Sequence, residues 1–219
     1  MSEGRLLTIT VGVTGASGAI LAQKALQLLE ADARVGRVHL VVTEAGLRLF
    51  AEELAIAGCE AKQLPGRILG AGSRKSEVLS SGKIEVLSNK DVGASIASGS
   101  YDVDAMVVIP CSMGTLGTIA AGVSDDLVSR AADVMLKEGR KLVLCVRDTP
   151  FNRIHLENML RAQSAGAVIM PAVPAFYHHP KTIDDLVTQY VCRVLAQINL
   201  PQDEMYRWAG SLAAKKADA

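Results

Sequence analysis

Short apolar runs alternate with helix-length segments along most of this chain. The run from Leu6 to Thr14 is rich in β-branched residues and stops at glycines, and the segment from Ala19 to Leu29 then carries apolar residues at helical spacing. The alternation continues downstream, with apolar runs at Val38–Thr43, Met106–Pro110, Leu142–Val146 and Val168–Met170 and helical patterns over Leu116–Leu136 and Arg153–Ala165. Alternation of this kind predicts a parallel sheet that helices cover on both faces.

Two segments depart from this regular alternation. Glycines and prolines interrupt every periodicity over residues 58–93, so we expect an irregular excursion there. Thr182 to Leu200 has the apolar stripe of an amphipathic helix, which Pro201 is expected to end. The chain of 219 residues shows no internal repeat and no linker. We therefore expect a single domain, 1–219, with a Rossmann-like (flavodoxin-like) α/β fold.

Charge and composition narrow the range of functions. Lys plus Arg and Asp plus Glu both number 23, and aromatic residues make up only 4%, which argues against a nucleic-acid or membrane partner. The start of the chain lacks a signal peptide, and no apolar run reaches the roughly 18 residues of a membrane span. The four cysteines are widely spaced, without the grouping that zinc needs. These features predict a cytoplasmic protein with reduced thiols and no metal, acting on small molecules.

The first glycine-rich loop is GVTGASGA at residues 12–19, between a predicted strand and a predicted helix. Gly15 and Gly18 permit tight turns, and Ser17 offers a hydroxyl beside the free amides of the helix start, where a phosphate fits. Ordinary turn chemistry, with Ser17 as the helix N-cap, explains the segment equally well. Thr43 ends the second strand, where a dinucleotide site usually has an acid, so a nicotinamide cofactor is disfavoured.

A second loop of this kind is IPCSMGTLGTIAAG at residues 109–122. Ser112 and Thr115 supply hydroxyls, and the small residues would let a planar ligand approach closely. The alternative is that Ser112 only caps the next helix. Because the carboxyl ends of parallel strands share one sheet edge, two such loops favour a mononucleotide. Cys111 is a candidate nucleophile, although an unreactive buried thiol is the more common state.

Charged side chains in later segments are candidates for binding an anion. Arg147 and Asp148 directly follow the fourth predicted strand, where a surface ion pair is the alternative. Arg193 lies on the apolar helix and needs an anionic partner if it is buried, or else extends to solvent. Lys137 precedes Glu138, and this pair taken alone indicates a solvated helix face.

Histidines occur in two of the later segments. His155 lies in HLENML, and His178 and His179 follow Tyr177 in GAVIMPAVPAFYHHP. Neighbouring side chains diverge in most backbone conformations, so the adjacent pair is a poor metal site. We therefore expect no metal there.

Taken together, these segments resemble the flavin prenyltransferase family, the UbiX and Pad1 proteins once described as aromatic acid decarboxylases. The resemblance covers about residues 6–208. It rests on motifs that follow one another in the family's order, namely TGASGA, PCSMGTL, RAADVMLKE, HLENM, GAVIMPAVPAFYHHP and the tail residue Trp208. One fragment alone would be weak evidence, but the joint order and spacing are highly specific.

This resemblance implies an activity, a cofactor and partners. Members of the family join the dimethylallyl group of dimethylallyl monophosphate to N5 and C6 of reduced FMN, without a metal, and release phosphate and prenylated FMN. The product would serve a partner decarboxylase of the UbiD type. Family members are homododecamers built from trimers, with active sites at subunit contacts. The tail, about residues 201–219, is thus expected to cross to a neighbouring subunit.

The resemblance also implies roles for individual residues. FMN would contact Gly15, Ala16, Ser17, Thr43, Ser112, Met113, Gly114, Thr115 and Arg147. Lys137, Tyr177 and Arg193 would bind the allyl phosphate, with Ser17 as a further donor. Trp208 would offer a π face to the allylic cation, on a neighbouring subunit's flavin if the tail crosses. Glu53 aligns with the family's active-site glutamate.

These residue types suit the chemistry of prenyl transfer. Breaking an allylic C–O bond leaves a cation and a phosphate dianion, so fixed cations and donors around the phosphate lower the barrier. Ring closure at C6 then requires loss of a proton, for which the departing phosphate, Glu53 and Asp148 are candidate acceptors. Asp148 stands where family members commonly have a glutamate and is one methylene shorter.

Two other functions are alternatives. A flavin-dependent cysteine decarboxylase shares a flavin-binding α/β fold, but it would need oxidised FMN and a carboxylate-binding loop. A non-catalytic flavin carrier would bind FMN without releasing phosphate from an allyl donor. The set of Lys137, Tyr177 and Arg193 favours phosphate over the substrate carboxylate of the decarboxylase, whereas only turnover distinguishes the carrier.

Overall fold

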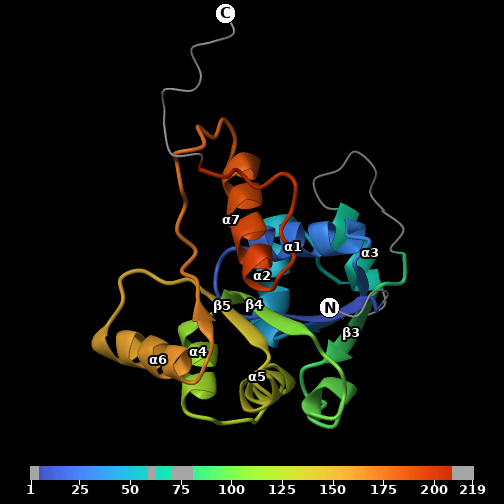
Figure 1. Ribbon diagram of the computed structural model, residues 1–219, viewed down its shortest axis with the longest axis vertical. Helices are drawn as coiled ribbons and strands as arrows, with labels where there is room; N and C mark the ends of the chain where they lie inside the picture. Colours follow the sequence, from blue (N-terminus) through green and yellow to red (C-terminus); the bar gives the residue numbers. More distant parts are fainter. Residues whose placement is uncertain (1–4, 59–62, 71–80, 209–219) are drawn as a thin grey trace, which may run out of the picture.

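The computed structural model describes residues 5–58, 63–70 and 81–208 (Figure 1). These residues form one six-stranded parallel sheet with helices on both faces. The strands are β1 (Leu7–Val13), β2 (Val35–Val42), β3 (Ile84–Ser88), β4 (Ala105–Cys111), β5 (Lys141–Val146) and β6 (Val168–Ile169). The helices are α1 (Ala19–Ala31), α2 (Glu44–Leu54), α3 (Leu64–Gly70), α4 (Met113–Ala120), α5 (Leu127–Lys137), α6 (Arg153–Ser164) and α7 (Ile183–Gln197), with a short 3₁₀ turn at Ser95–Ala97.

The strand order is β3-β2-β1-β4-β5-β6, which is the order of the Rossmann fold. The five apolar runs in the sequence form the strands β1, β2, β4, β5 and β6. The order of these five strands, β2-β1-β4-β5-β6, is that of the flavodoxin fold. The α/β fold predicted from the alternation is therefore confirmed. The expected irregular excursion over 58–93 is wrong in part, because this stretch contains α3 and the edge strand β3. Residues 59–62 and 71–80 of that stretch lie outside the described residues.

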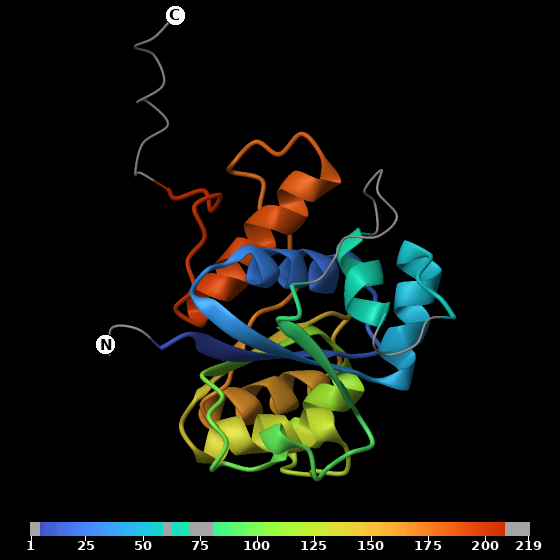
Figure 2. The ribbon, with the colours of Figure 1, turned by 90° about the vertical axis from the view of Figure 1, so that its right-hand side faces the viewer.

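Helices lie on both sides of the sheet (Figure 2), and each side has its own hydrophobic core. On β4, Val107 and Ile109 point to the side of α1 and α7, while Met106 and Val108 point to the side of α4, α5 and α6. All four side chains are buried, as expected for strands covered on both faces. The sheet is thus a rigid middle layer, and its edges present the loops.

Two helix boundaries differ from the expectation. The pattern over Leu116–Leu136 is not one helix, because Gly122 takes a left-handed conformation (φ 68°) between α4 and α5. Thr182 caps α7 by accepting a hydrogen bond from the amide of Asp185, but the helix ends at Gln197. Asn199, with φ 62°, turns the chain before Pro201 is reached. Asparagine tolerates this conformation better than most residues do.

The sheet has a topological switch point between β1 and β4. From β1 the chain winds outward through β2 to β3, and from β4 it winds the other way through β5 to β6. The loops after β1 and β4 therefore leave from adjacent strand ends in opposite directions. A crevice at such a point is where open α/β sheets bind ligands.

The described part of the tail, residues 201–208, runs back along its own subunit. Arg34 donates to the carbonyl of Pro201 (2.9 Å), and the Gln202 amide donates to Asp32 (3.0 Å). Asp32 also accepts hydrogen bonds from Arg34, which hold the pKa of that carboxyl well below its usual range. The amino-terminal part of the tail is thereby fixed beside the end of α1.

Candidate functional site

A buried threonine joins the two loops at the switch point. The Thr14 hydroxyl donates to the carbonyl of Pro110 (2.9 Å) and accepts a hydrogen bond from the amide of Ser112 (2.8 Å). Its side chain is fully buried, so neither bond competes with water. The relative position of the β1–α1 and β4–α4 loops is therefore fixed before any ligand arrives.

The amino end of α1 is capped by a carboxylate from another helix. Glu53, on α2, accepts hydrogen bonds from the amides of Gly18 (3.0 Å) and Ala19 (2.7 Å). Gly18 is the N-cap residue, at φ 125°, and no side chain caps the helix from that position. The interpretation of Ser17 as N-cap is therefore wrong, and its exposed side chain is left facing outward from the loop. Glu53 lies beside the first loop.

We expect Glu53→Gln to weaken this contact. The amide retains one acceptor oxygen but loses the negative charge that suits a helix amino terminus, so a loss of about 1 kcal/mol in the free energy of unfolding is expected. Denaturant unfolding of the variant measures this loss. Glu52→Gln is the control, because Glu52 is exposed and has no hydrogen bond to a described residue. Equal stability of the two variants would contradict the capping role.

Thr43 brings the second strand into the same edge. Its amide donates to the carbonyl of Val13 (3.0 Å), and its hydroxyl caps α2 by accepting from the amide of Gly46 (3.1 Å). The packing between this turn and the first loop is very tight, since a Cβ on Gly15 would lie 2.6 Å from the Cβ of Ala45. Gly15 is thus required for α2 to approach the loop.

The loop after β4 presents a helix start. Ser112 is the N-cap of α4 and accepts from the amide of Thr115 (3.3 Å), so the capping interpretation holds. The Ser112 hydroxyl also donates to the Thr115 hydroxyl (3.1 Å). A Cβ on Gly114 would meet nothing closer than 4.0 Å, which leaves its side of the loop open. Ser112, Met113 and Thr115 are half-buried around it.

Cys111, directly before this loop, is a buried core thiol rather than an accessible nucleophile. It is completely buried, and burial raises its pKa far above the ordinary value. Burial likewise raises the pKa of Cys145 to about 12, and that of Cys192 to about 11. These three thiols are therefore protonated at neutral pH.

Arg147 and Asp148 behave differently from one another. The Arg147 amide donates to the carbonyl of Cys111 (3.1 Å), which ties the end of β5 to the loop after β4. Its Nε atom is buried and has no hydrogen-bond partner among the described residues. Asp148 is exposed and accepts from the amide of Thr149 (2.8 Å). They form no ion pair with each other, so the surface-pair interpretation does not apply.

An aromatic cluster forms where the tail meets the loop before α7. Tyr177 lies 5.6 Å from Tyr206 and 6.3 Å from Trp208 between ring centroids, the latter edge-on at 83°. His178 contacts both tyrosines. Arg193 is exposed on α7 and forms no ion pair within the described residues. Of the predicted phosphate ligands, Tyr177 is therefore in contact with Trp208, and Arg193 is available to an anion.

Lys137 lies near the amino ends of the strands, whereas the loops described above follow their carboxyl ends. Helix α5 begins beside Asn89, just past the carboxyl end of β3, and ends at Lys137, shortly before the first residue of β5. The Lys137 ammonium pairs with Glu138 and lies against Gly99. One subunit alone does not bring Lys137 to the other predicted phosphate ligands.

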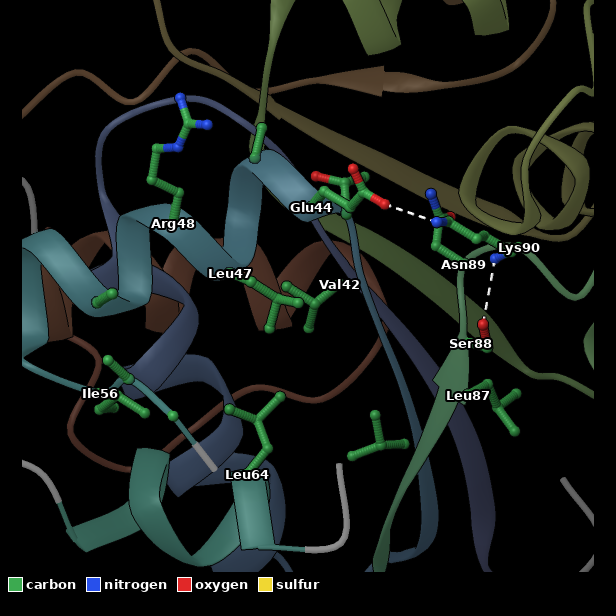
Figure 3. Close-up of a pocket in the computed structure, with 16 residues that line it drawn as sticks. Val42, Glu44, Leu47, Arg48, Ile56, Leu64, Leu87, Ser88, Asn89 and Lys90 are labelled. Atoms are coloured by element: carbon green, nitrogen blue, oxygen red, sulfur yellow. Dashed lines mark hydrogen bonds and ion pairs between the residues drawn. The ribbon is translucent and has the colours of Figure 1, made fainter. Parts of the chain in front are cut away.

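A cavity of about 1130 Å³ opens beside Thr43, between α2, α3 and β3 (Figure 3). Its apolar wall includes Val42, Leu47 and Leu64, and Glu44 pairs with Lys90 at 2.7 Å across its rim. Arg48 points away from these apolar side chains in Figure 3. The cavity includes Thr43 but none of the other residues predicted to bind FMN. It therefore flanks the switch point.

The described residues offer neither a metal site nor a membrane span. Within the described ranges, no group of three or more His, Cys, Asp and Glu side chains is placed to hold a metal ion. His155 instead completes the cap of α6 with Asn152. No helix in the same ranges has both the length and the hydropathy to cross a bilayer.

Three structurally important residues escaped the sequence analysis. The sequence does contain an indication for Thr14, because a hydroxyl that ends a buried β-branched run needs hydrogen-bond partners. Gln189 and Tyr206 had none, because a glutamine on an amphipathic helix and a tyrosine in a tail are individually unremarkable. Their contact appears only once the tail is folded back on α7.

The fold defines an α/β protein of the open, doubly wound class, in which several strand-end loops meet at one switch point. Comparisons with known proteins agree. The family model described as Flavoprotein matches residues 2–195. The flavin prenyltransferase UbiX of Halalkalibacterium halodurans is 46% identical over 200 residues, covering 91% of this chain and 92% of that protein. This chain belongs to the UbiX flavin prenyltransferases of the flavoprotein family, and is a transferase.

Solved structures support the assignment. AnUbiX (PadA1), crystallised in complex with FMN and dimethylallyl pyrophosphate, is 40% identical with a TM-score of 0.80 over 94% of this chain and all of that one. A dodecameric FMN-dependent UbiX-like decarboxylase from Escherichia coli O157:H7 is 41% identical, with a TM-score of 0.79 over 93% of this chain and all of that one. The cysteine decarboxylase TvaF is only 15% identical, with a TM-score of 0.56, and shares the fold alone.

Proposed function

We propose that this enzyme transfers the dimethylallyl group of dimethylallyl monophosphate to N5 and C6 of reduced FMN and releases prenylated FMN and phosphate. The observation that carries the proposal is the convergence of Thr43, Ser112 and Arg147 at one sheet edge in a chain of this family. The relative crystallised with dimethylallyl pyrophosphate leaves the phosphate form of the donor to experiment. The monophosphate is our choice because Asp-rich, metal-binding motifs do not follow the strands.

The described residues fit a bound flavin mononucleotide. Arg147 Nε is a buried donor that lacks a protein acceptor, which a ligand oxygen would satisfy. Gly114 leaves its side of the β4–α4 loop open to a planar group. Ser17, Thr43 and Thr115 add hydroxyls at the same edge, together with Gly15, Ala16, Ser112 and Met113. When bound, reduced FMN supplies the two nucleophilic atoms, N5 and C6.

The protein's own part is to hold the phosphate and shield the allylic carbon. Arg193 can bind two phosphate oxygens with its fork of donors, and the Tyr177 hydroxyl can donate to a third. Both interactions strengthen as the C–O bond breaks, because negative charge grows on the leaving group. Trp208, in contact with Tyr177, offers an aromatic ring to the allylic cation.

We propose that Lys137 acts on the active site of a neighbouring copy. Its position at the far edge of its own sheet supports this, as does the dodecameric assembly of the relative from Escherichia coli. The described tail residues, 201–208, pack on their own α7, while 209–219 lie outside the described residues. The crossing of the tail and the action of Trp208 on another subunit's flavin thus stay predictions, as do the dodecamer and the single-domain boundaries.

The acceptor for the C6 proton is again a proposal among three groups. Glu53 already accepts two amide hydrogen bonds, which hold its carboxylate beside the first loop. Asp148 is exposed and engaged only with the neighbouring amide of Thr149. On these contacts Glu53 is the better placed protein group, and the departing phosphate is the alternative.

The test is anaerobic incubation of the enzyme with reduced FMN and either dimethylallyl monophosphate or dimethylallyl pyrophosphate. We expect a flavin heavier by one prenyl group and release of inorganic phosphate with the monophosphate. Flavin binding without phosphate release would indicate a carrier, and loss of CO₂ from a peptidyl cysteine with oxidised FMN would indicate the decarboxylase alternative. Transfer of the product to a UbiD-type decarboxylase in the cytoplasm is the further expectation, checked by activation of such an apoenzyme.

A further inference from the structure

Gln189 holds the tail backbone with both ends of its amide. Its Nε2 donates to the carbonyl of Tyr206 (3.2 Å), and its Oε1 accepts from the amide of the same residue (2.9 Å). The side chain is only 4% exposed, in the middle of α7. A buried amide satisfied by one backbone residue acts as a two-point clamp, because leaving both groups unpaired would be costly.

The clamp lies next to the aromatic cluster. Tyr206, whose backbone is held, packs its own ring against Tyr177 at 5.6 Å. Trp208 follows two residues later and meets Tyr177 edge-on, an arrangement that aromatic quadrupoles favour. Trp208 is still 55% exposed, so it has few other contacts to hold it in place. Its position therefore depends on the point where the tail is attached.

The clamp is also in register with the proposed phosphate ligand on α7. Arg193 is four residues after Gln189, one turn further along the same side of the helix. The upstream tail is attached independently, through Arg34 to Pro201 and Asp32 to Gln202. Those contacts fix the start of the tail beside α1. The part of the tail near Trp208 is held by Gln189 instead.

We propose that Gln189 is a positioning residue for prenyl transfer, which clamps the tail at Tyr206 so that Trp208 is held against Tyr177 beside the allyl donor. The proposal rests on the donor-binding role of Tyr177 and Arg193 proposed above. Gln189 itself touches neither donor nor flavin in this arrangement. It acts through the two aromatic side chains.

The test is Gln189→Met, which keeps the size of the side chain and removes both hydrogen bonds. Trp208 is the chain's only tryptophan, so its fluorescence reports the position of the tail directly. We expect a red-shifted emission and stronger quenching by acrylamide. We also expect a rise of about tenfold in KM for dimethylallyl monophosphate, with an unchanged Kd for FMN.

The control is Gln197→Met, since Gln197 is on the same helix and forms no hydrogen bond with the described residues. Far-UV circular dichroism of both variants checks that the fold is retained. If Trp208 fluorescence of Gln189→Met equals that of the wild type, the clamp is overturned whatever the enzyme's reaction. If the fluorescence changes while KM and kcat for the donor do not, the clamp exists but its role in the reaction is overturned. If neither the wild type nor either variant prenylates FMN, the proposed function is contradicted instead.

Discussion

Replacing Arg193 with alanine is expected to lower kcat/KM for the allyl donor by about 10²–10³-fold while FMN binding stays unchanged. The guanidinium is exposed on α7 and forms no ion pair within the described chain, so its removal costs the fold little. Its effect falls on the leaving group, whose negative charge grows in the transition state. Steady-state kinetics with reduced FMN and dimethylallyl monophosphate, together with flavin titration, measure the two quantities separately.

Arg193→Lys separates charge from geometry, because lysine retains the charge but cannot bind two phosphate oxygens with one rigid fork. We expect it to recover only part of the lost rate. Arg37→Ala is the matched control, since Arg37 has an exposed ion pair with Glu85 (3.6 Å) that contributes little to stability. An Arg193→Ala enzyme as active as the Arg37→Ala enzyme would rule out a phosphate-binding role.

Gly46→Ala is expected to cause a large loss of stability, because the added methyl group would meet backbone atoms. A Cβ at Gly46 would lie 2.7 Å from the carbonyl oxygen of Val13 and 3.0 Å from a methyl group of Val42. The first contact is with backbone at the end of β1, which cannot move without disturbing the first loop. Overpacking of this kind costs about 1–3 kcal/mol, and each kcal/mol lowers Tm by roughly 2–4 °C in a chain of this size.

Calorimetry and flavin titration of Gly46→Ala check this expectation. Weaker FMN binding should accompany the lower Tm, because α2 would be pushed away from the loop that contains Gly15. Gly93→Ala is the control, since Gly93 has ordinary backbone angles and its nearest neighbour would be 3.4 Å away. A Tm for Gly46→Ala that matches the control would show that the tight packing at α2 is not required.

The sequence was sufficient for most of the fold. Strands buried on both faces need continuous apolar runs, and each of the five runs in the sequence became a strand. The edge strand β3 was missed because one of its faces is not fully covered, so Glu85 and partly exposed residues break the apolar run. Two short helices replaced one expected helix because a single glycine, Gly122, can reverse the chain at little cost.

The candidate site could be predicted only where the position of a residue depends on the sequence next to it. Loop residues such as Ser112 and Thr43 are placed by the strand that precedes them, so their shared edge followed from the parallel sheet. Glu53 was assigned by resemblance, and its capping of α1 depends on how two helices pack. The position of Lys137 at the other edge follows from the direction of α5. The contact between the tail and Gln189 requires two segments that no periodicity connects.

The buried thiols have a consequence for the prenyl transfer proposed above, in which an alkylating carbocation forms. Sulfur is the side-chain atom such an electrophile would attack most readily, and only the thiolate attacks well. Cys111 and Cys145 lie on the strands that lead to the edge proposed to bind flavin, yet both are fully enclosed, and burial raises the pKa of each thiol. Burial thereby protects these two cysteines from alkylation by an electrophile formed at that edge.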